Sequence, residues 1–309
     1  MNLELRPIAA EDRAEVAELI YCSINYWYRT HGAPEIFRGG PSVTEVFYDV
    51  YNDLTPGANV VAVNTDTGRL MGSCFYHPRE RHVSLGIMNV HPNYFGNGVG
   101  SKLLQHVIDY TNDNGYEALR LTSSAINIDS FSLYNKAGFV PRHSFQDMIT
   151  QVPDGGIQRS TPGDDRVRDA TLNDVAEMAA LEMQVSGITR KIDYQYCIEN
   201  RRGYWHVSVI ESPTGDLDGF IISCGHQAMN MIGPCIARTD DDAASLILRE
   251  LNQHPGRMPV CLIPMEREKL VRQLYDWGAR NCEMHFCQVY GKFQPFDGVS
   301  MPTFLPETG

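Results

Sequence analysis

The sequence lacks the features of secreted and membrane proteins. Its eight cysteines form no CxxC pair, and several of them, such as Cys224 and Cys261, lie inside apolar runs. Buried free thiols of this kind are typical of a reducing compartment. The first residues contain no basic segment followed by an apolar core, and no apolar run approaches the ~18 residues of a membrane span. These absences predict a soluble, cytoplasmic protein that does not enter a membrane.

The sequence also has fewer basic than acidic residues. The 309 residues include 26 Lys and Arg against 38 Asp and Glu, which gives a formal net charge of -12. Because a protein that binds phosphate backbones needs a basic surface, this balance argues against a nucleic-acid partner. It suits a cationic substrate such as an amine, although acidity is equally typical of proteins that only need to be soluble. With 43% hydrophobic and 21% charged residues, the chain is an ordinary globular protein, long enough for two domains.

An internal repeat organises the chain. Residues 5–12 and residues 167–174 each predict a strand and a turn that lead into a helix with apolar periodicity. Arg6 corresponds to Arg168 and Asp12 to Asp174, both at an offset of 162 positions (168 − 6 and 174 − 12). A pattern repeated at a fixed offset indicates an internal duplication.

Domain boundaries follow from a segment without apolar periodicity between the two copies. Val152–Asp165 holds two prolines and three glycines, which is typical of a linker. We therefore predict a first domain at residues 1–151, a linker at 152–165, a second domain at 166–293 and a C-terminal tail at 294–309. The tail is apolar and bounded by prolines at residues 301–306, and we expect it to dock in a surface groove.

Each copy predicts one α+β unit with a mixed, mostly antiparallel sheet flanked by helices. The expected order is a strand, two helices, a three-stranded meander, a helix, a strand, a helix and a closing strand. Runs rich in Val, Ile and Phe with turn signals between them predict the meander strands. These are Asn59–Asn64, Arg69–Tyr76 and Val83–Val90 in the first copy, and Trp205–Glu211, Leu217–Cys224 and Asn230–Ala237 in the second.

A glycine-rich turn follows the last meander strand of the first copy. The strand ends at Pro92, and a helix is expected to begin near Gly98. Glycines at 96, 98 and 100 allow backbone N–H groups to point at one spot, where the helix N-terminus adds its positive end. This arrangement predicts an anion site suited to a pyrophosphate. The alternative is a tight strand-to-helix turn without a ligand.

A second motif downstream decides between these alternatives. The first motif contains Val90-His91-Pro92 and the glycine turn, and the second contains Asn127, Ser130, Leu133, Tyr134, Gly138 and Phe139. Together, in this order and spacing, they resemble the GNAT superfamily of acetyl-CoA-dependent N-acetyltransferases. The resemblance is strong over residues 1–150. The second half resembles a degenerate copy, which implies two GNAT-like acyl-CoA N-acyltransferase folds in tandem.

The resemblance implies a role for each motif residue, with acetyl-CoA as co-substrate and no metal. Backbone groups of the strand Met88-Asn89-Val90 would pair with the pantetheine arm. Asn127 and Ser130 belong to the motif that binds the cofactor, with the Asn127 side chain on the pantetheine. Tyr134 would give a proton to the departing thiolate. Backbone N–H groups that would hold the pyrophosphate come from Phe95, Gly96, Asn97, Gly98, Val99, Gly100 and Ser101.

Two departures from the family pattern leave open questions. Phe95 stands where many relatives have Gln or Arg, so one side-chain contact to the phosphates is missing. Thr122 stands where many relatives have a glutamate, so the general base is unassigned. His82 and His91 flank the central strand and titrate in a suitable range, although either is also consistent with a structural histidine. A water relayed by Asn89 is a further candidate.

Two other segments bear on what each copy binds. The cluster Tyr26, Trp27 and Tyr28 lies where the family's first helices cover the acceptor pocket, and it is either an amine-binding wall or core packing. In the second copy the segment Ile236–Ala244 replaces the glycine turn. It has no glycine and three consecutive aspartates, which suit a helix N-terminus and repel a pyrophosphate. We expect only the first copy to bind acetyl-CoA.

Three functions remain open on the sequence alone. The leading one is transfer of an acetyl group to a primary amine of a small molecule or peptide, by direct attack in a ternary complex. The second is a binding protein that senses an acyl-CoA or a metabolite without turnover, and the third is a tandem scaffold. The sequence names neither the acceptor nor the oligomeric state, for which a monomer and a homodimer are both expected possibilities.

Overall fold

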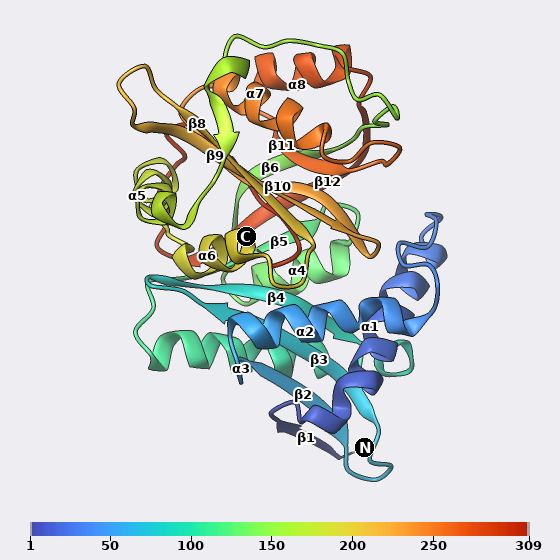
Figure 1. Cartoon of the computed structure of the whole chain (residues 1–309). Helices are drawn as coiled ribbons and strands as arrows, with labels where there is room; N and C mark the ends of the chain where they lie inside the picture. Colours follow the sequence, from blue (N-terminus) through green and yellow to red (C-terminus); the bar gives the residue numbers. More distant parts are fainter. Residues whose placement is uncertain (1, 308–309) are drawn as a thin grey trace. The chain divides into compact units, whose positions relative to one another are not determined.

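A computed structural model describes residues 2–307, which divide into two compact units. Unit 1 consists of residues 2–119 and the C-terminal segment 305–307, and unit 2 consists of residues 120–304. Each unit is treated by itself below (Figure 1).

Unit 1 is an antiparallel four-stranded sheet with helices on both faces. The strands are ordered β1-β2-β3-β4, each antiparallel to its neighbour. Their bounds are β1 Leu3–Arg6, β2 Asn59–Asn64, β3 Leu70–Pro78 and β4 His82–Val90. The helices are α1 Arg13–Thr30, α2 Glu45–Leu54 and α3 Val99–Asp113, with 3-10 turns η1 Ala10–Asp12, η2 Pro41–Thr44 and η3 Pro92–Tyr94.

Alternation along β3 shows which helices cover which face of this sheet. Phe75 packs against Tyr51 of α2, with ring centroids 5.1 Å apart. Its neighbour Tyr76 packs against Tyr110 of α3 at 4.9 Å. Because successive side chains of a strand point to opposite faces, α2 and α3 lie on opposite sides of the sheet, as Figure 1 shows.

Unit 2 is built on a longer sheet in the order β5-β12-β6-β11-β10-β9-β8-β7, with β13 paired to β10. Its strands are β5 Ala118–Ser124, β6 Val140–Ile149, β7 Val167–Asp169, β8 Trp205–Glu211, β9 Leu217–His226, β10 Met229–Ala237, β11 Val260–Pro264, β12 Arg280–Gly291 and β13 Val299–Met301. Its helices are α4 Ile128–Lys136, α5 Val175–Ser186, α6 Lys191–Glu199, α7 Asp240–Leu251 and α8 Glu268–Asp276, with 3-10 turns η4 Asp164–Arg166 and η5 Leu172–Asp174.

The two predicted copies are interlocked within unit 2. Strand β6 comes from the first copy, yet it lies between β11 and β12, both of the second copy. Strand β12 in turn separates β5 from β6. The compact units therefore do not coincide with the sequence copies, and the predicted domain bounds at 151 and 166 stay a prediction about the duplication.

The duplication predicted from the helix openings is visible in the hydrogen bonds. Arg6 forms a two-pronged ion pair with Asp12 at 2.6 and 2.9 Å, and Arg168 does the same with Asp174 at 2.9 and 2.8 Å. Each aspartate also accepts a backbone N–H three residues upstream, at the start of its 3-10 turn. The same latch at the same offset of 162 positions (168 − 6) shows that both copies begin with the same local structure.

The segments between and after the copies are buried in unit 2. Residues 150–163 contain no helix or strand, but Val152 and Ile157 pack in the hydrophobic core of unit 2. The tail differs from the expectation of a surface groove. Val299–Met301 is a buried strand that pairs antiparallel with β10, because buried backbone N–H and C=O groups need hydrogen-bond partners.

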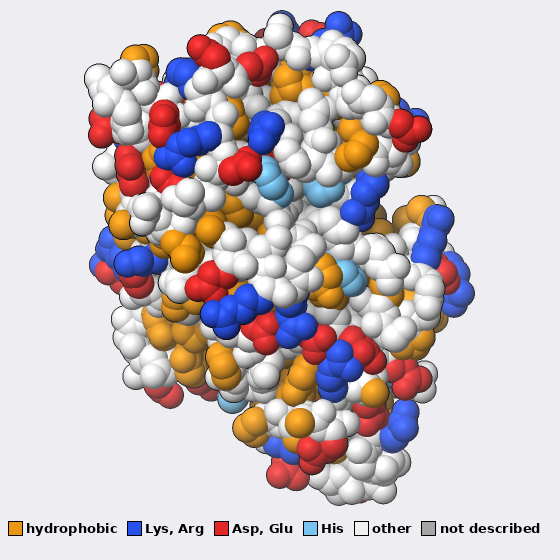
Figure 2. Space-filling view, in the orientation of Figure 1, with side chains coloured by type: hydrophobic (Ala, Val, Ile, Leu, Met, Phe, Trp, Pro, Cys, Tyr) orange, Lys and Arg blue, Asp and Glu red, His pale blue; other side chains and the backbone are white. Residues whose placement is uncertain are grey.

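The meander strands agree with the sequence analysis. The predicted ranges Asn59–Asn64 and Trp205–Glu211 are β2 and β8, and the others differ by one or two residues at their ends. Among residues 2–307, no helix combines the length and the apolar character needed to cross a bilayer. On the face shown in Figure 2, acidic and basic side chains are intermingled.

Candidate acyl-CoA site

Strand β4 of unit 1 carries the predicted pantetheine-binding backbone. Val90 pairs with Gly72 and Met88 with Cys74, but the register then shifts, so that Leu85 pairs with Tyr76. Between Met88 and Leu85, β4 thus has one residue more than β3, as in a β-bulge. Met88 and Val90 are partly exposed.

Hydrogen bonds to Ser73 and Ser23 hold the side chain of Asn89 inside unit 1. Its Oδ1 accepts from the Ser73 hydroxyl at 2.7 Å, and its Nδ2 donates to the Ser23 hydroxyl of α1 at 3.0 Å. The side chain is 7% exposed. These bonds fix helix α1 to β4 and explain why a polar residue stands in the buried strand, whereas the water relay proposed for Asn89 stays a prediction.

The glycine turn has the geometry expected of an anion site. Gly96 and Gly98 have φ values of 74° and 76°, and Gly98 is the N-cap of α3. No heavy atom lies within 4 Å of the place where either glycine would carry a Cβ, so the space above them is open. The first N–H groups of an α-helix such as α3 have no partner inside the helix and favour an anion. Residues of this turn can hold a pyrophosphate.

The structure narrows the set of predicted backbone donors. The N–H of Phe95 donates to the Pro92 carbonyl, and that of Asn97 to the Tyr94 carbonyl, both at 3.2 Å. These two groups are engaged inside the turn. The donors that remain for a ligand are those of Gly96 and of residues 98–101. Phe95 contributes a ring that is 45% exposed and lies 6.2 Å from the Tyr26 ring.

The corresponding helix of the second copy is closed to an anion. Helix α7 has Asp240, Asp241 and Asp242 in its first turn, and Thr239 caps it by accepting from the Asp242 N–H. Helix α3 has no acidic residue in its first turn. Because carboxylates neutralise the positive end of a helix, α7 needs no ligand there. The prediction that the acidic run begins a helix is confirmed.

Asn127 and Tyr134 belong to unit 2, on either end of α4. Asn127 is the N-cap of this helix, since its Oδ1 accepts from the Ser130 N–H at 3.1 Å. This bond uses the side-chain oxygen and leaves the amide N–H groups for a ligand. Tyr134 is 7% exposed and packs against Phe139 at 5.8 Å. The structure therefore places the proposed proton donor in a largely dry environment.

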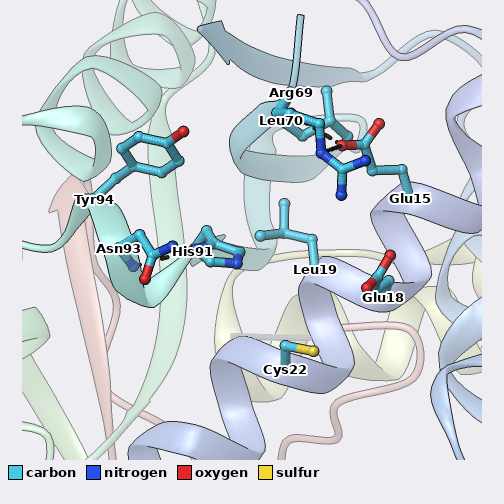
Figure 3. Close-up of a pocket in the computed structure, with 9 residues that line it drawn as sticks. All are labelled: Glu15, Glu18, Leu19, Cys22, Arg69, Leu70, His91, Asn93 and Tyr94. Carbon is cyan, nitrogen blue, oxygen red and sulfur yellow. Dashed lines mark hydrogen bonds and ion pairs between the residues drawn. The ribbon is translucent and has the colours of Figure 1, made fainter. Parts of the chain in front are cut away.

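A hollow beside the glycine turn was not anticipated from the sequence. It has a volume of about 220 Å³ and lies between α1 and the end of β4 (Figure 3). Glu15 accepts from the Arg69 guanidinium and from the Leu70 N–H, both at 3.2 Å. The residues that line the hollow are Glu15, Glu18, Leu19, Cys22, Arg69, Leu70, His91, Asn93 and Tyr94. In the sequence, only the pair Glu15 and Glu18 on one helix could have indicated this hollow, and such pairs are common on solvent-exposed helix faces.

The predicted acceptor wall lies elsewhere on α1. Tyr26, Trp27 and Tyr28 do not line the hollow. Trp27 stacks on His31 at 4.2 Å and meets Tyr28 edge-on at 5.2 Å. These contacts fit packing at the end of a helix, and a role in amine binding stays a prediction.

The two histidines considered as general bases have structural partners. His91 accepts from the Asn93 N–H at 3.2 Å and so caps the turn η3. His82 is 1% exposed, with Nε2 3.3 Å from the Ser84 hydroxyl. Both interactions hold local structure at the two ends of β4. Thr122 lies partly buried on β5 of unit 2 and offers no carboxylate.

Unit 2 contains one group of side chains with metal-ligand chemistry among the residues that the structure describes. Ligand atoms of Asp147, Glu283 and His285 all lie within 4.8 Å of one another. Nδ1 of His285 lies 3.0 and 2.9 Å from the two Asp147 carboxylate oxygens, and the Ser124 hydroxyl donates to Glu283. The group is satisfied by its own hydrogen bonds, so we assign no metal to it.

Comparison with known proteins agrees with this geometry. Residues 17–139 match the model of the acetyltransferase (GNAT) family. A stretch of 72 residues is 35% identical to the UPF0157 protein YqkA of Bacillus subtilis (strain 168) and covers 23% of this chain. The chain thus matches only 20% of the length of that curated relative.

Solved structures resemble the chain over nearly its whole length. A putative acetyltransferase from Pyrococcus horikoshii has a TM-score of 0.76 at 15% identity and covers 99% of this chain and 96% of its own. A GCN5-related N-acetyltransferase from Sphaerobacter thermophilus has a TM-score of 0.63 at 16% identity, with 96% and 97% covered. The tandem GNAT protein from the clavulanic acid biosynthesis pathway has a TM-score of 0.64 at 14% identity, with 94% and 98% covered.

These findings define the class of the protein. Residues 17–139 match the model of the acetyltransferase (GNAT) family, which confirms the resemblance drawn from the two motifs. The chain as a whole has the tandem GNAT fold, an α+β architecture of mixed sheets flanked by helices. At identities of 14–16%, these three solved structures support the fold and not a substrate.

Proposed function

We propose that this protein is an N-acetyltransferase that moves an acetyl group from acetyl-CoA to a primary amine of a small molecule or peptide. The observation that carries the proposal is the open glycine turn at the N-terminus of α3. Gly96 and Gly98 are held in left-handed conformations there, with free space at their Cβ positions. These glycines lead directly into α3, which has no acidic residue in its first turn, so its N-terminal N–H groups and the positive end of the helix favour an anion.

The proposal assigns the steps to residues by the chemistry each can perform. The N–H groups of Gly96 and of residues 98–101 bind the pyrophosphate, and backbone groups of Met88 and Val90 bind the pantetheine arm. The amide of Asn127 donates to the same arm. The amine attacks the thioester carbon directly, in a ternary complex, and the C–S bond breaks. Tyr134 gives its hydroxyl proton to the thiolate that leaves.

The retained Tyr134 favours an enzyme over the alternative, a protein that senses an acyl-CoA or metabolite without turnover. Tyr134 offers a hydroxyl proton to a departing thiolate, a function that a sensor does not need. We further propose that the chain acts in the cytoplasm as a monomer or homodimer, without a nucleic-acid or membrane partner. The net charge of -12 supports the exclusion of nucleic acid.

Calorimetry and an amine panel test this proposal together. Acetyl-CoA should bind once per chain, because α7 of the second copy has three aspartates where α3 has glycines. Mixing the chain, acetyl-CoA and primary amines should release CoA thiol in proportion to acetylated product. A stoichiometry of two would contradict the assignment to the first copy. Tight binding without transfer to any amine of the panel would favour the sensor.

A further inference from the structure

Unit 2 contains a second, much smaller cavity that has no part in the proposed function. Its volume is about 10 Å³, which is room for a single particle the size of a water molecule. Strands β5, β6, β12 and β13 contribute to its wall, together with the segment before α6 and the segment after β12. The residues that line it are Arg120, Phe145, Ile188, Arg190, Cys287, Phe296, Ser300 and Pro302.

Two buried guanidinium groups line this cavity. Arg120 and Arg190 are each 2% exposed, although arginine is among the residue types that are rarely buried. An arginine keeps its positive charge at any physiological pH, and its five N–H groups donate hydrogen bonds but accept none. Because both side chains border so small a space, their charges lie close together.

The carboxylates near Arg190 lie outside the lining of the cavity. Nε of Arg190 donates to the buried Glu182 at 2.6 Å, and Asp193 interacts with the same guanidinium electrostatically. Neither carboxylate belongs to the lining. Among residues 2–307, no aspartate or glutamate borders the cavity, so an occupant would meet two positive groups and no negative one.

The rest of the lining is apolar or carries one S–H or O–H group. The Cys287 sulfur lies 3.9 Å from a terminal nitrogen of Arg120, and burial raises the pKa of Cys287, so it is a thiol at neutral pH. Ser300 contributes a hydroxyl and is 6% exposed. The Phe296 ring lies on the other side of Arg120, with its centroid 6.0 Å from the guanidinium carbon. Donors therefore outnumber acceptors among the lining side chains.

This excess of donors distinguishes between the two kinds of particle that fit. A buried water molecule makes about three hydrogen bonds, and it needs acceptors for its own two hydrogens. The lining side chains offer only a hydroxyl oxygen and a sulfur, which is a weak acceptor. A monatomic anion needs donors alone, and two nearby guanidinium groups attract it strongly away from bulk water. A carboxylate or a phosphate has too many heavy atoms for this volume.

We propose that the cavity is a halide site, in which Arg120 and Arg190 hold one chloride ion. The bound anion replaces the repulsion between two buried cations by two attractions. Arg120 belongs to β5 of the first copy and Arg190 to the second copy, so neither copy contains the site by itself. Strand β5 also leads into α4, which carries Asn127 and Tyr134, and chloride thus holds the strand that precedes both residues.

Thermal unfolding of the full chain in different sodium salts tests the site. A ligand that binds only the folded state raises the midpoint as its concentration rises. At equal ionic strength, we expect the midpoint to rise from gluconate, which is too large to enter, to chloride or bromide. At ten times the dissociation constant the rise should be about 3–6 °C. A midpoint that depends on ionic strength alone would contradict the proposal.

The variant Arg120→Gln removes one of the two charges and keeps a polar side chain. Its midpoint should be the same in chloride and in gluconate. The matched control is Arg79→Gln, because Arg79 is a buried arginine of unit 1, 6% exposed, that does not line the cavity. Whatever its own midpoint, this control should keep the full difference between the two salts. A difference that survives Arg120→Gln unchanged would mean that the salts act elsewhere.

Bromide locates the anion directly and keeps the proposal testable should Arg120→Gln fail to fold. Crystals of the unmodified chain grown in sodium bromide should show an anomalous peak at the bromine absorption edge, within hydrogen-bond distance of both guanidinium groups. A water molecule without anomalous signal at this place, or an empty cavity, would overturn the proposal. None of these measurements requires acetyl transfer, so their outcome is independent of the proposed function.

Discussion

The side chain of Asn127 combines a structural bond with a free donor. Its oxygen caps α4 by accepting the Ser130 N–H at 3.1 Å, which satisfies one of the four orphan donors of that helix. Its NH₂ group does not take part in this cap and is available to donate to an acyl arm. A motif residue can thus be required by the fold and by the ligand at once, and substitution alone would not separate the two.

Tyr134 allows a cleaner separation, because the ring and the hydroxyl do different things. Tyr134→Phe keeps the packing against Phe139 and removes the hydroxyl group, and with it the proton. We expect acetyl-CoA affinity to stay nearly unchanged and kcat to fall about 100- to 10,000-fold. Calorimetry and steady-state thiol release measure the two quantities. Unchanged turnover with a good amine would mean that the thiolate receives its proton from another group.

At the scale of elements, helices α3 and α7 show how one fold gives a ligand-binding and a closed helix start. The first begins at Gly98 in a left-handed conformation, without acidic residues in its first turn. The second begins at Thr239 with three aspartates. The difference is one of backbone freedom and charge, and both can be recognised in the sequence once the two copies are aligned.

Gly98→Val tests the ligand-binding start. A valine side chain would fill the open space proposed for the pyrophosphate, and a branched residue disfavours the φ value of 76°. We expect acetyl-CoA binding to be lost in calorimetry, along with about 1–2 kcal/mol of folding stability from the strained backbone.

Gly115→Val is the matched control for this variant. Gly115 follows α3 at its other end, with a φ value of 70° and open space at its Cβ position. It should show a similar loss of stability in chemical denaturation and keep its affinity. If Gly98→Val bound acetyl-CoA as well as Gly115→Val does, the glycine turn would not be the pyrophosphate site.

At the scale of the whole molecule, the second copy contributes structure that the first copy cannot replace. Strand β6 lies between β11 and β12, so residues 140–149 have both of their neighbours in the second half of the chain. The segment 305–307 also belongs to unit 1, where Glu307 accepts from the Tyr51 hydroxyl. Without the second copy, both edges of β6 would be unpaired, and unpaired strand edges promote aggregation.

We therefore expect residues 1–152 expressed alone to be poorly soluble or inactive, although they contain every motif residue. Size-exclusion chromatography, circular dichroism and the thiol-release assay measure this. The full chain cut within residues 152–165 after folding is the control, and its halves should stay associated through β6. A monomeric, stable fragment with full activity would show that the second copy is dispensable.

The sequence by itself determined what depends on near neighbours. Strands β2 and β8 and the start of α3 were predictable, because alternation and glycine are local signals. The family followed from two motifs in one order.

Only the tertiary structure decided which distant segments meet. Tyr51 and Glu307 are 256 residues apart, and nothing near either residue specifies the other. The insertion of β6 between β11 and β12 has the same origin, since antiparallel edges pair by their backbone groups whatever copy supplies them. The local patterns determined the elements of each copy, and the pairing of buried edges and buried polar groups across the chain determined how the two copies complete one another.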